Sequence, residues 1–245
     1  MAGYDARRNR SLARPSVDLR AMLAPAIEQG TRPLCIPIVV TAAHEACRTQ
    51  PPEPLAPDAL WSNCVADGTA SRDGTTLEAV SDALRTEGQP PLADWPFNTA
   101  ISHEADPAPP TAQASIWYQA ELAPVAVAND GIEDDIEDLL AVGLVVVLIV
   151  EVTDEFERAE PDGNMEVPPL TASQGAYHAV LVVGVRTYEG DRVLLVRNSW
   201  GTGWGAGGYG WLPMDYLIAF GALAGAIEPT SCTSDGQPST WGIDS

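Results

Sequence analysis

The chain contains no lysine, and positive charge of any kind is scarce. Its 13 basic residues are all arginine, against 34 aspartates and glutamates, so the formal net charge is -21 at pH 7. A surface of this sign repels phosphate backbones, and we therefore expect no nucleic-acid partner. The absence of lysine fits a codon bias towards arginine. Selection against a modifiable amine is the alternative, and no other feature of the sequence supports it.

Long hydrophobic runs are also missing. Residues 1–20 carry five arginines and no apolar stretch of the kind that a secretory signal needs. The longest apolar run, residues 144–150, is far too short to cross a bilayer and is typical of a buried strand. We therefore expect a cytoplasmic protein with no membrane partner.

Cysteine is too rare for a disulfide-dense secreted scaffold. The four cysteines are Cys35, Cys47, Cys64 and Cys232. In a reducing compartment we expect free thiols, with Cys47 and Cys64 buried and Cys232 exposed. His44 is predicted to be structural, and His103 to lie in a connection. No set of side chains has the spacing of a zinc site, so we expect no metal ion and no cofactor.

The first half of the chain has helical patterns. Residues 35–48 suit a buried helix, and Pro37 requires that this helix begin at or just before Cys35, because proline is tolerated only in the first turn. A second helix is predicted to reach about residue 87. Its start has capping-box spacing from Thr75 to Glu78, and Gly88 is its stop.

The second half has strand patterns after one short helix. Asp130 is expected to cap that helix, Gly143 to end it, and its acidic run at 133–138 to form a solvated face. Strands are predicted at 144–152, 177–186, 192–198 and 208–212, with a turn at 189–191. The predicted fold class is α+β with an active cleft between the halves. The expected parts are a flexible arm (1–17), a helical half (18–105), a strand-rich half (106–226) and a loose tail (227–245).

Three side chains from these elements suit thiol chemistry. Cys35 at a helix N-terminus is favoured as a thiolate by the helix dipole. His178 lies in one predicted strand, and Asn198 ends the next. Paired about a turn near residue 190, these strands place residues 181–182 opposite Asn198, so His178 is within reach if a bulge or twist intervenes. A carboxamide there would hold the imidazole in one tautomer.

The motifs around these residues resemble the papain family (clan CA) of cysteine peptidases, in a bacterial-type form. The segment Asn-Ser-Trp-Gly-Thr-Gly-Trp-Gly at 198–205 is similar to the family's asparagine motif, 178–180 to its histidine strand, and Gln29-Gly30 to its glutamine segment. The resemblance implies a papain-like fold, a helical half with the nucleophile and a barrel-like, sheet-rich half. It makes Cys35 the nucleophile, His178 the base and then acid, and Asn198 the orienting residue. Gln29 and the Cys35 N–H would hold the oxyanion, and Trp200 would shield the His178–Asn198 bond.

The chain departs from the family's Cys-Gly-Ser-Cys-Trp pattern around the nucleophile. Arg32 stands where the family has the first cysteine of that pattern, so the corresponding disulfide cannot form. Ile36 is implied to lie on the leaving-group side of the cleft, and Gly74 beside the pocket for the second substrate residue. The sequence before residue 18 is short, so we expect no propeptide and a regulatory partner or a narrow specificity in its place.

The predicted function is hydrolysis of a peptide or protein substrate by a thiol peptidase through an acyl-enzyme. One alternative is a transpeptidase or ligase that uses the same triad but passes the acyl group to an amine. Another is a catalytically weak pseudopeptidase that only binds peptides, its cleft blocked by Ile36 and Pro37. Reaction with a thiol-directed probe distinguishes the last from the first two.

Overall fold

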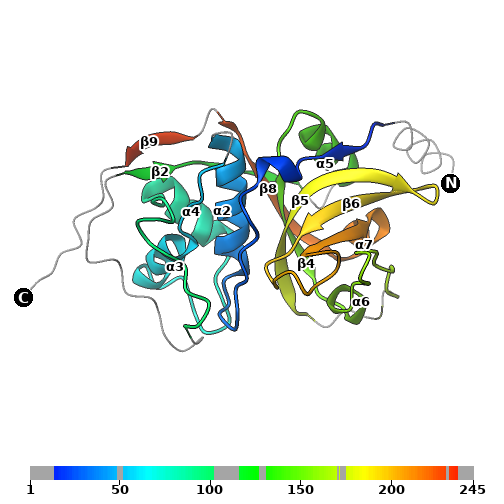
Figure 1. Cartoon of the computed structure of the whole chain (residues 1–245), viewed down its shortest axis with the longest axis horizontal. Helices are drawn as coiled ribbons and strands as arrows, with labels where there is room; N and C mark the ends of the chain where they lie inside the picture. Colours follow the sequence, from blue (N-terminus) through cyan, green and yellow to red (C-terminus); the bar gives the residue numbers. More distant parts are fainter. Residues whose placement is uncertain are drawn as a thin grey trace, which may run out of the picture.

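The computed structural model describes residues 14–48, 52–101, 116–126, 131–169, 171, 175–229 and 232–236. A helical half and a sheet half lie side by side, which confirms the α+β prediction (Figure 1). The elements are β1 (Val17–Asp18), η1 (Arg20–Met22), α2 (Cys35–Arg48), α3 (Pro57–Ala66), α4 (Leu77–Thr86), β2 (Trp117–Gln119), β3 (Leu122–Val125), α5 (Ile132–Ala141), β4 (Val146–Glu151), α6 (Asp154–Glu157), β5 (Tyr177–Tyr188), β6 (Asp191–Arg197), β7 (Tyr209–Pro213), α7 (Met214–Phe220), β8 (Gly221–Ile227) and β9 (Thr233–Gly236).

Helix α2 is the element that joins the two halves. It spans the predicted residues, with Pro37 in its first turn, and most of it is buried. Its small and branched side chains pack both against α3 and α4 and against the sheet. The ribbon of α2 lies between these two layers in Figure 1. A helix buried on most sides is apolar over most of its surface, and α2 also buries the polar residues Thr41, His44 and Glu45.

The start of α4 differs by one residue from the prediction. Thr76, not Thr75, is the N-cap, and its side chain accepts a hydrogen bond from the Ala79 N–H at 3.2 Å. The Thr75 hydroxyl instead donates to the Thr69 carbonyl. Gly88 follows the helix with a positive φ of 77°, as predicted for a stop.

In the described part of the chain, seven strands form one antiparallel sheet in the order β3-β8-β4-β5-β6-β7, with β1 also paired to β5. The four predicted strands correspond to β4, β5, β6 and β7. Alternate side chains of β5 enter two separate cores: Ala179 and Leu181 face α2, whereas Val180 and Val182 face α5 and α7. Strand β5 is buried on both faces and reads as a continuous apolar run for that reason.

The β5–β6 hairpin contains a β-bulge. Its turn residues Glu189 and Gly190 have positive φ angles of 50° and 90°, the geometry of a tight two-residue turn. Pairing then shifts by one residue between Val182 and Gly184. A one-residue shift moves every later side chain to the opposite face of the sheet. The bulge thereby puts His178 on the same face as Asn198, the residue that follows β6.

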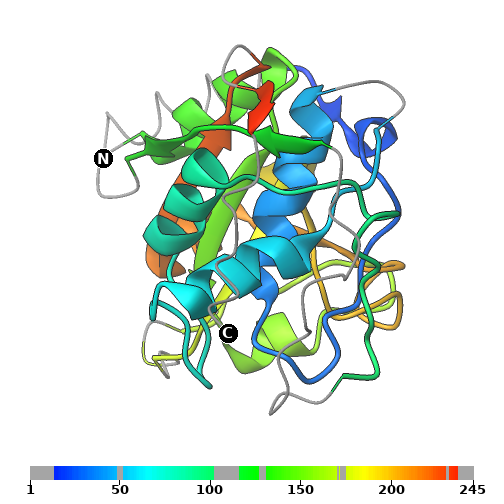
Figure 2. The same ribbon diagram turned by 90° about the vertical axis from the view of Figure 1, so that its left-hand side faces the viewer.

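The two ends of the described chain each attach to a half. Strand β1 pairs with β5, and the Leu19 N–H donates to the Val183 carbonyl at the bulge at 2.8 Å. Strand β9 pairs with β2 beside α4 (Figures 1 and 2). The prediction of a loose tail is therefore wrong at 233–236, which form β9. The described end of the predicted arm is attached to α5, because Arg14 forms ion pairs with Asp134 and Asp138. The predicted boundary at 105/106 lies outside the described residues.

The acidic helix α5 is not solvated along its whole predicted face. Glu137 is buried and forms an ion pair with Arg192 at 2.5 Å. The N-cap of α5 is Gly131, which makes no side-chain hydrogen bond, and the predicted cap Asp130 lies outside the described residues. The periodicity of the apolar residues placed the helix correctly, but it does not reveal a buried ion pair.

The prediction of four free thiols is wrong for two of the cysteines. Cys47 and Cys232 form a disulfide between the end of α2 and the residue before β9, whereas Cys35 and Cys64 are free. A separation of 185 residues along the chain hides this pairing from any local pattern. Among the described residues no helix has the length and apolarity to span a membrane.

Candidate active site

Cys35 is the first residue of α2 and is partly exposed. The Leu34 carbonyl before it accepts the first hydrogen bond of the helix, from the Ile38 N–H at 3.0 Å. Cys35 also lies against the sheet half, because the Ala179 N–H forms a hydrogen bond with its thiol. Ala179 is the neighbour of His178 in β5, so α2 and β5 bring Cys35 beside the histidine strand.

His178 and Asn198 form a hydrogen bond, as the predicted hairpin requires. The ring Nε2 lies 2.7 Å from Asn198 Oδ1, and both side chains are buried. A carboxamide oxygen only accepts, so Nε2 must carry the proton and Nδ1 is the ring nitrogen left free to accept one. The same oxygen accepts the Ser199 N–H at 2.7 Å, which fixes the carboxamide.

An aromatic cluster covers this hydrogen bond. The Trp200 ring lies 4.5 Å from the His178 ring, between centroids, at an interplanar angle of 38°. Phe156 of α6 packs edge-on against both rings, and the Trp204 ring packs in turn against Phe156. Water is excluded from this side, and a hydrogen bond is electrostatically stronger where the local dielectric constant is low.

Burial changes the titration of both groups. It lowers the pKa of His178 to about 4, and the Asn198 hydrogen bond opposes that shift. Burial also raises the pKa of Cys35, while the N–H groups of Ala179, Ile36 and Cys35 itself lower it in part. Each group alone is thus favoured in its neutral form, and an ion pair needs the two charges to form together.

Gln29 lies on the loop that leads to Cys35 and is fixed by three hydrogen bonds. Its Oε1 accepts from the Ser199 hydroxyl at 2.6 Å, its Nε2 donates to the Arg32 carbonyl at 3.0 Å, and its main-chain N–H donates to the Ser199 carbonyl at 2.9 Å. An amide nitrogen has two protons, so one remains for an oxyanion. Ser199, for which no role was predicted, therefore links Gln29 to the strand that leads to Asn198, and its place inside the asparagine motif was the available signal.

The other predicted cleft residues lie close to Cys35 in the chain or in space. Ile36 is the second residue of α2 and is partly buried against the core. Gly74 has a φ of 122°, and a Cβ built on it would meet the Pro33 carbonyl oxygen at 3.7 Å. Gly74 thus lies beside Pro33, which is two positions before Cys35 in the chain. A larger residue there would narrow the space beside Pro33.

The remaining titratable candidates are separate from this site. Cys64 is buried, and His44 is buried with its Nδ1 2.8 Å from the Gln89 amide nitrogen, which fits the predicted structural role. His103 lies outside the described residues. Within the described ranges no group of three or more His, Cys, Asp or Glu side chains is arranged to hold a metal ion.

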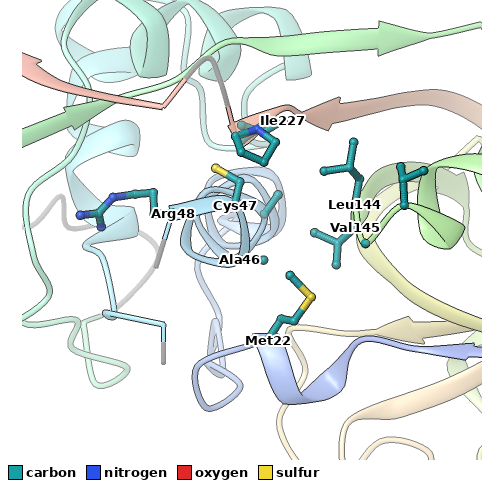
Figure 3. Close-up of a pocket in the computed structure, with 11 residues that line it drawn as sticks. Met22, Ala46, Cys47, Arg48, Leu144, Val145 and Ile227 are labelled. Atoms are coloured by element: carbon teal, nitrogen blue, oxygen red, sulfur yellow. The ribbon is translucent and has the colours of Figure 1, made fainter. Parts of the chain in front are cut away.

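A pocket of about 280 Å³ lies at the opposite end of α2 from Cys35 (Figure 3). Its apolar lining includes Met22, Leu144, Val145 and Ile227, and it reaches the disulfide at Cys47. None of the predicted site residues lines it. It is therefore distinct from the site formed by Cys35, His178 and Asn198.

Known proteins resemble this chain in sequence and in fold. It is 40% identical to ananain from Ananas comosus over 63 residues, 25% of this chain and 18% of that protein. It is 26% identical to cysteine proteinase 3 from Dictyostelium discoideum over 136 residues, 56% and 38% of the two chains. The matched parts thus span well under two thirds of these relatives' lengths.

Solved structures match over more of the chain. Xylellain, a cysteine protease from Xylella fastidiosa, superposes with a TM-score of 0.69 at 22% identity, covering 89% of this chain and 88% of that one. Procathepsin B S9 from Trypanosoma congolense gives 0.70 at 14% identity, covering 89% and 80%. At these identities the likeness establishes the fold, and the predicted papain-like architecture is confirmed.

The family model of papain family cysteine proteases matches residues 64–218. That range contains His178, Asn198 and Trp200 but begins after Gln29 and Cys35. The nucleophile segment departs most from the family pattern, in keeping with the sequence around Arg32 and Ile36. The match nevertheless extends over more than half of the chain, and the chain belongs to the papain family of cysteine proteases.

Proposed function

We propose that this protein is a cysteine-type peptidase that hydrolyses peptide bonds through Cys35, His178 and Asn198. The observation that carries the proposal is the 2.7 Å hydrogen bond from His178 Nε2 to Asn198 Oδ1. The strand that holds His178 also contacts the Cys35 thiol, through the Ala179 N–H. A thiol, a base and a group that orients the base are the parts that nucleophilic acyl transfer needs.

The reaction begins with attack of Cys35 Sγ on the scissile carbonyl carbon, as the thiol proton passes to His178 Nδ1. The Cys35 N–H and the second Gln29 Nε2 proton bind the developing oxyanion. The tetrahedral adduct then collapses, the carbon–nitrogen bond breaks, and the imidazolium gives its proton to the leaving amine. A thioester between Cys35 and the acyl part of the substrate remains.

Water completes the cycle. His178 accepts a proton from the water as its oxygen attacks the thioester carbon, and the same two donors bind the second oxyanion. Collapse releases the carboxylic acid and returns the proton to Cys35 Sγ. Throughout, Asn198 keeps Nδ1 directed at the reacting atoms, and Trp200 keeps water from the Nε2 side.

Peptides or proteins are the proposed substrates, bound between the halves in an extended form. On the helical side the chain near the nucleophile includes Ile36 and the Gly74–Pro33 contact. Ile36, Gly74 and Pro33 are small or apolar and carry no charge. We therefore expect apolar substrate side chains to be accepted near the cleaved bond.

The test is cleavage of a peptide library, read by mass spectrometry, with the wild type, Cys35→Ala and Cys64→Ala. The wild type and Cys64→Ala should give the same products, because Cys64 is a buried thiol away from the site, and Cys35→Ala should give none. Products from Cys35→Ala would exclude Cys35 as the nucleophile. A wild type that is alkylated at Cys35 but cleaves nothing would favour peptide binding without catalysis, and acyl transfer to an added amine would favour a transpeptidase.

A further inference from the structure

Arg32 has the largest fully buried side chain among the described residues, three positions before Cys35. Its Nη2 donates to Asp58 Oδ1 at 2.6 Å, and the two side chains are 2% and 1% exposed. Asp58 lies in the first turn of α3, so the ion pair joins the loop before the nucleophile to the helical half. The Phe97 ring lies 5.6 Å from the guanidinium carbon and packs over it.

Stability alone does not account for a pair built in this way. Taking both charges out of water is costly, and a buried ion pair is often no more stabilising than an apolar pair of the same size. Here Arg32 Nη1 and Asp58 Oδ2 are buried and have no hydrogen-bond partner in the described part of the protein. Burial raises the pKa of Asp58, against the opposing effect of Arg32.

The main chain of Arg32 holds the groups that would bind an oxyanion. Its carbonyl accepts from Gln29 Nε2 at 3.0 Å and from the Leu34 N–H at 2.9 Å. The next residue, Cys35, contributes its own N–H. The carbonyl of Arg32 therefore holds both the Gln29 amide and the residue before Cys35, so a shift of this carbonyl moves the Gln29 amide.

The loop is fastened to both halves of the molecule. On the sheet side Ser199 holds Gln29, and the Arg197 guanidinium donates to the carbonyls of Ala24 and Pro25 at 3.0 Å each. On the helical side Leu34 packs with Trp61 of α3, a contact without directional preference. A charge-assisted hydrogen bond is directional, so the Arg32–Asp58 bond orients the loop on the helical side in a way that apolar packing does not.

We propose that Arg32 and Asp58 are positioning residues, whose buried ion pair fixes the loop from Gln29 to Cys35 so that both oxyanion donors point to one place. The inference rests on the proposed peptidase function for its catalytic consequence. The structural part, that Asp58 holds the Gln29 amide through Arg32, stands apart from turnover.

The experiment compares Asp58→Asn with Glu137→Gln. The second variant is the matched control, because it neutralises the other buried arginine–carboxylate pair, Arg192–Glu137, at the far end of β6 from Asn198. Asp58→Asn should lower kcat about tenfold with little change in KM, less than the loss of a whole oxyanion donor. It should also weaken a peptidyl aldehyde inhibitor by a similar factor, because the bound hemithioacetal oxygen occupies the oxyanion position.

Two further measurements separate positioning from loss of fold. Cys35 alkylation by iodoacetamide should stay within about twofold in both variants, because alkylation develops no oxyanion. The NMR resonances of the Gln29 side-chain amide should shift in Asp58→Asn and not in Glu137→Gln. If Asp58→Asn does not fold, the double variant Arg32→Met, Asp58→Leu removes both charges and should fold with a low kcat and a weak aldehyde affinity.

The outcomes are distinct. Equal kcat and aldehyde affinity in Asp58→Asn and Glu137→Gln, or a double variant with wild-type kcat, would overturn the positioning role. A wild type that is neither alkylated at Cys35 nor active on peptides would overturn the proposed function instead. In that event an unshifted Gln29 amide in Asp58→Asn would overturn the structural part of the inference, and a shifted one would support it.

Discussion

At the scale of single residues, Asn198 is the group whose proposed role has the most geometric support. Its oxygen accepts from His178 Nε2 and from the Ser199 N–H, so it fixes both the tautomer and the tilt of the ring. Asn198→Ala would leave the helix terminus and His178 in place but free the ring to rotate. We expect kcat to fall roughly 10²-fold, less than in Cys35→Ala or His178→Ala, because an orienting residue contributes less than the group it orients.

Alkylation supplies the second measurement for Asn198→Ala. Reaction of Cys35 with iodoacetamide near pH 6 should persist, since the thiol and its neighbouring N–H groups are unchanged. Asn98→Ala, which removes an exposed carboxamide that only caps the Ala100 N–H, is the matched control and should behave as the wild type. Normal turnover in Asn198→Ala would mean that the hydrogen bond has no part in catalysis.

The titratable groups Cys35 and His178 lead to a prediction about pH. In Cys35→Ala no thiolate can stabilise an imidazolium, so the pKa of His178 should lie at about 4, below its usual 6.5, because burial disfavours the charged ring. The folded state then binds fewer protons than the unfolded chain between these values. Its stability therefore falls as the pH drops from 6.5 towards 4.

NMR titration of the His178 ring in Cys35→Ala measures that pKa directly. The complementary variant, His178→Ala, should shift the pH midpoint of Cys35 alkylation above the ordinary thiol range, because burial raises the pKa of the thiol. A His178 pKa near 6.5 in Cys35→Ala would show that the ring is solvated, against the enclosed site described above.

At the scale of elements, patterns of apolar residues predicted what is local. Helix α2 was expected at 35–48 and lies there, since one proline and one apolar face define it. The strands at β4 to β7 followed from apolar runs, and the β5–β6 turn from the residues at 189–191. The nearness of His178 to Asn198 was predicted only on condition of a bulge or twist, and the structure contains the bulge at Val183.

What the patterns missed depends on residues far apart in the chain. The ion pairs Arg32–Asp58 and Arg192–Glu137 join charged residues that are usually solvated, so no periodicity predicts their burial. The disulfide Cys47–Cys232 and the pairing of β9 with β2 likewise depend on the path of the whole chain. The position of Pro37 predicted a helix start at Cys35, but this pattern alone did not mark Cys35 as a nucleophile. That hypothesis came from the motifs around His178 and Asn198 in the later strands.

The disulfide between α2 and the segment before β9 should stabilise the fold. Closing 185 residues of chain restricts the unfolded state, and such a bond contributes about 2–5 kcal/mol to the free energy of unfolding. Dithiothreitol should therefore lower the melting temperature of the wild type but not that of Cys232→Ala, which lacks the bond already. Calorimetry with and without the reductant measures both.

Cys64→Ala is the control for that prediction, because Cys64 is a free and buried thiol. Its melting temperature should respond to dithiothreitol as the wild type does. If the wild type and Cys232→Ala respond equally, Cys47 and Cys232 are not bonded in solution, and the original prediction of free thiols at these two positions would stand.

At the scale of the whole molecule, the arrangement explains how a small set of side chains is held between two halves. The proposed nucleophile, Cys35, comes from the helical half, and the proposed base and orienting residue, His178 and Asn198, come from the sheet half. Strand β1 and strand β9 attach the ends of the described chain to one half each, and α2 packs against both. Relative motion of the halves would separate Cys35 from His178, so these attachments serve the site as well as the fold.

The net charge of -21 gives the last prediction. The field of such a surface attracts cationic peptides and raises their rate of encounter, and salt screens it, with a Debye length of about 30 Å at 0.01 M and about 8 Å at 0.15 M. For a substrate with two arginines outside the cleaved residues, kcat/KM should fall several-fold between these ionic strengths, whereas kcat should hardly change. The same peptide with citrulline in place of each arginine is the matched neutral control and should show little dependence on salt. Equal salt dependence of the two peptides would mean that the acidic surface does not act at the cleft, and that its charge serves solubility instead.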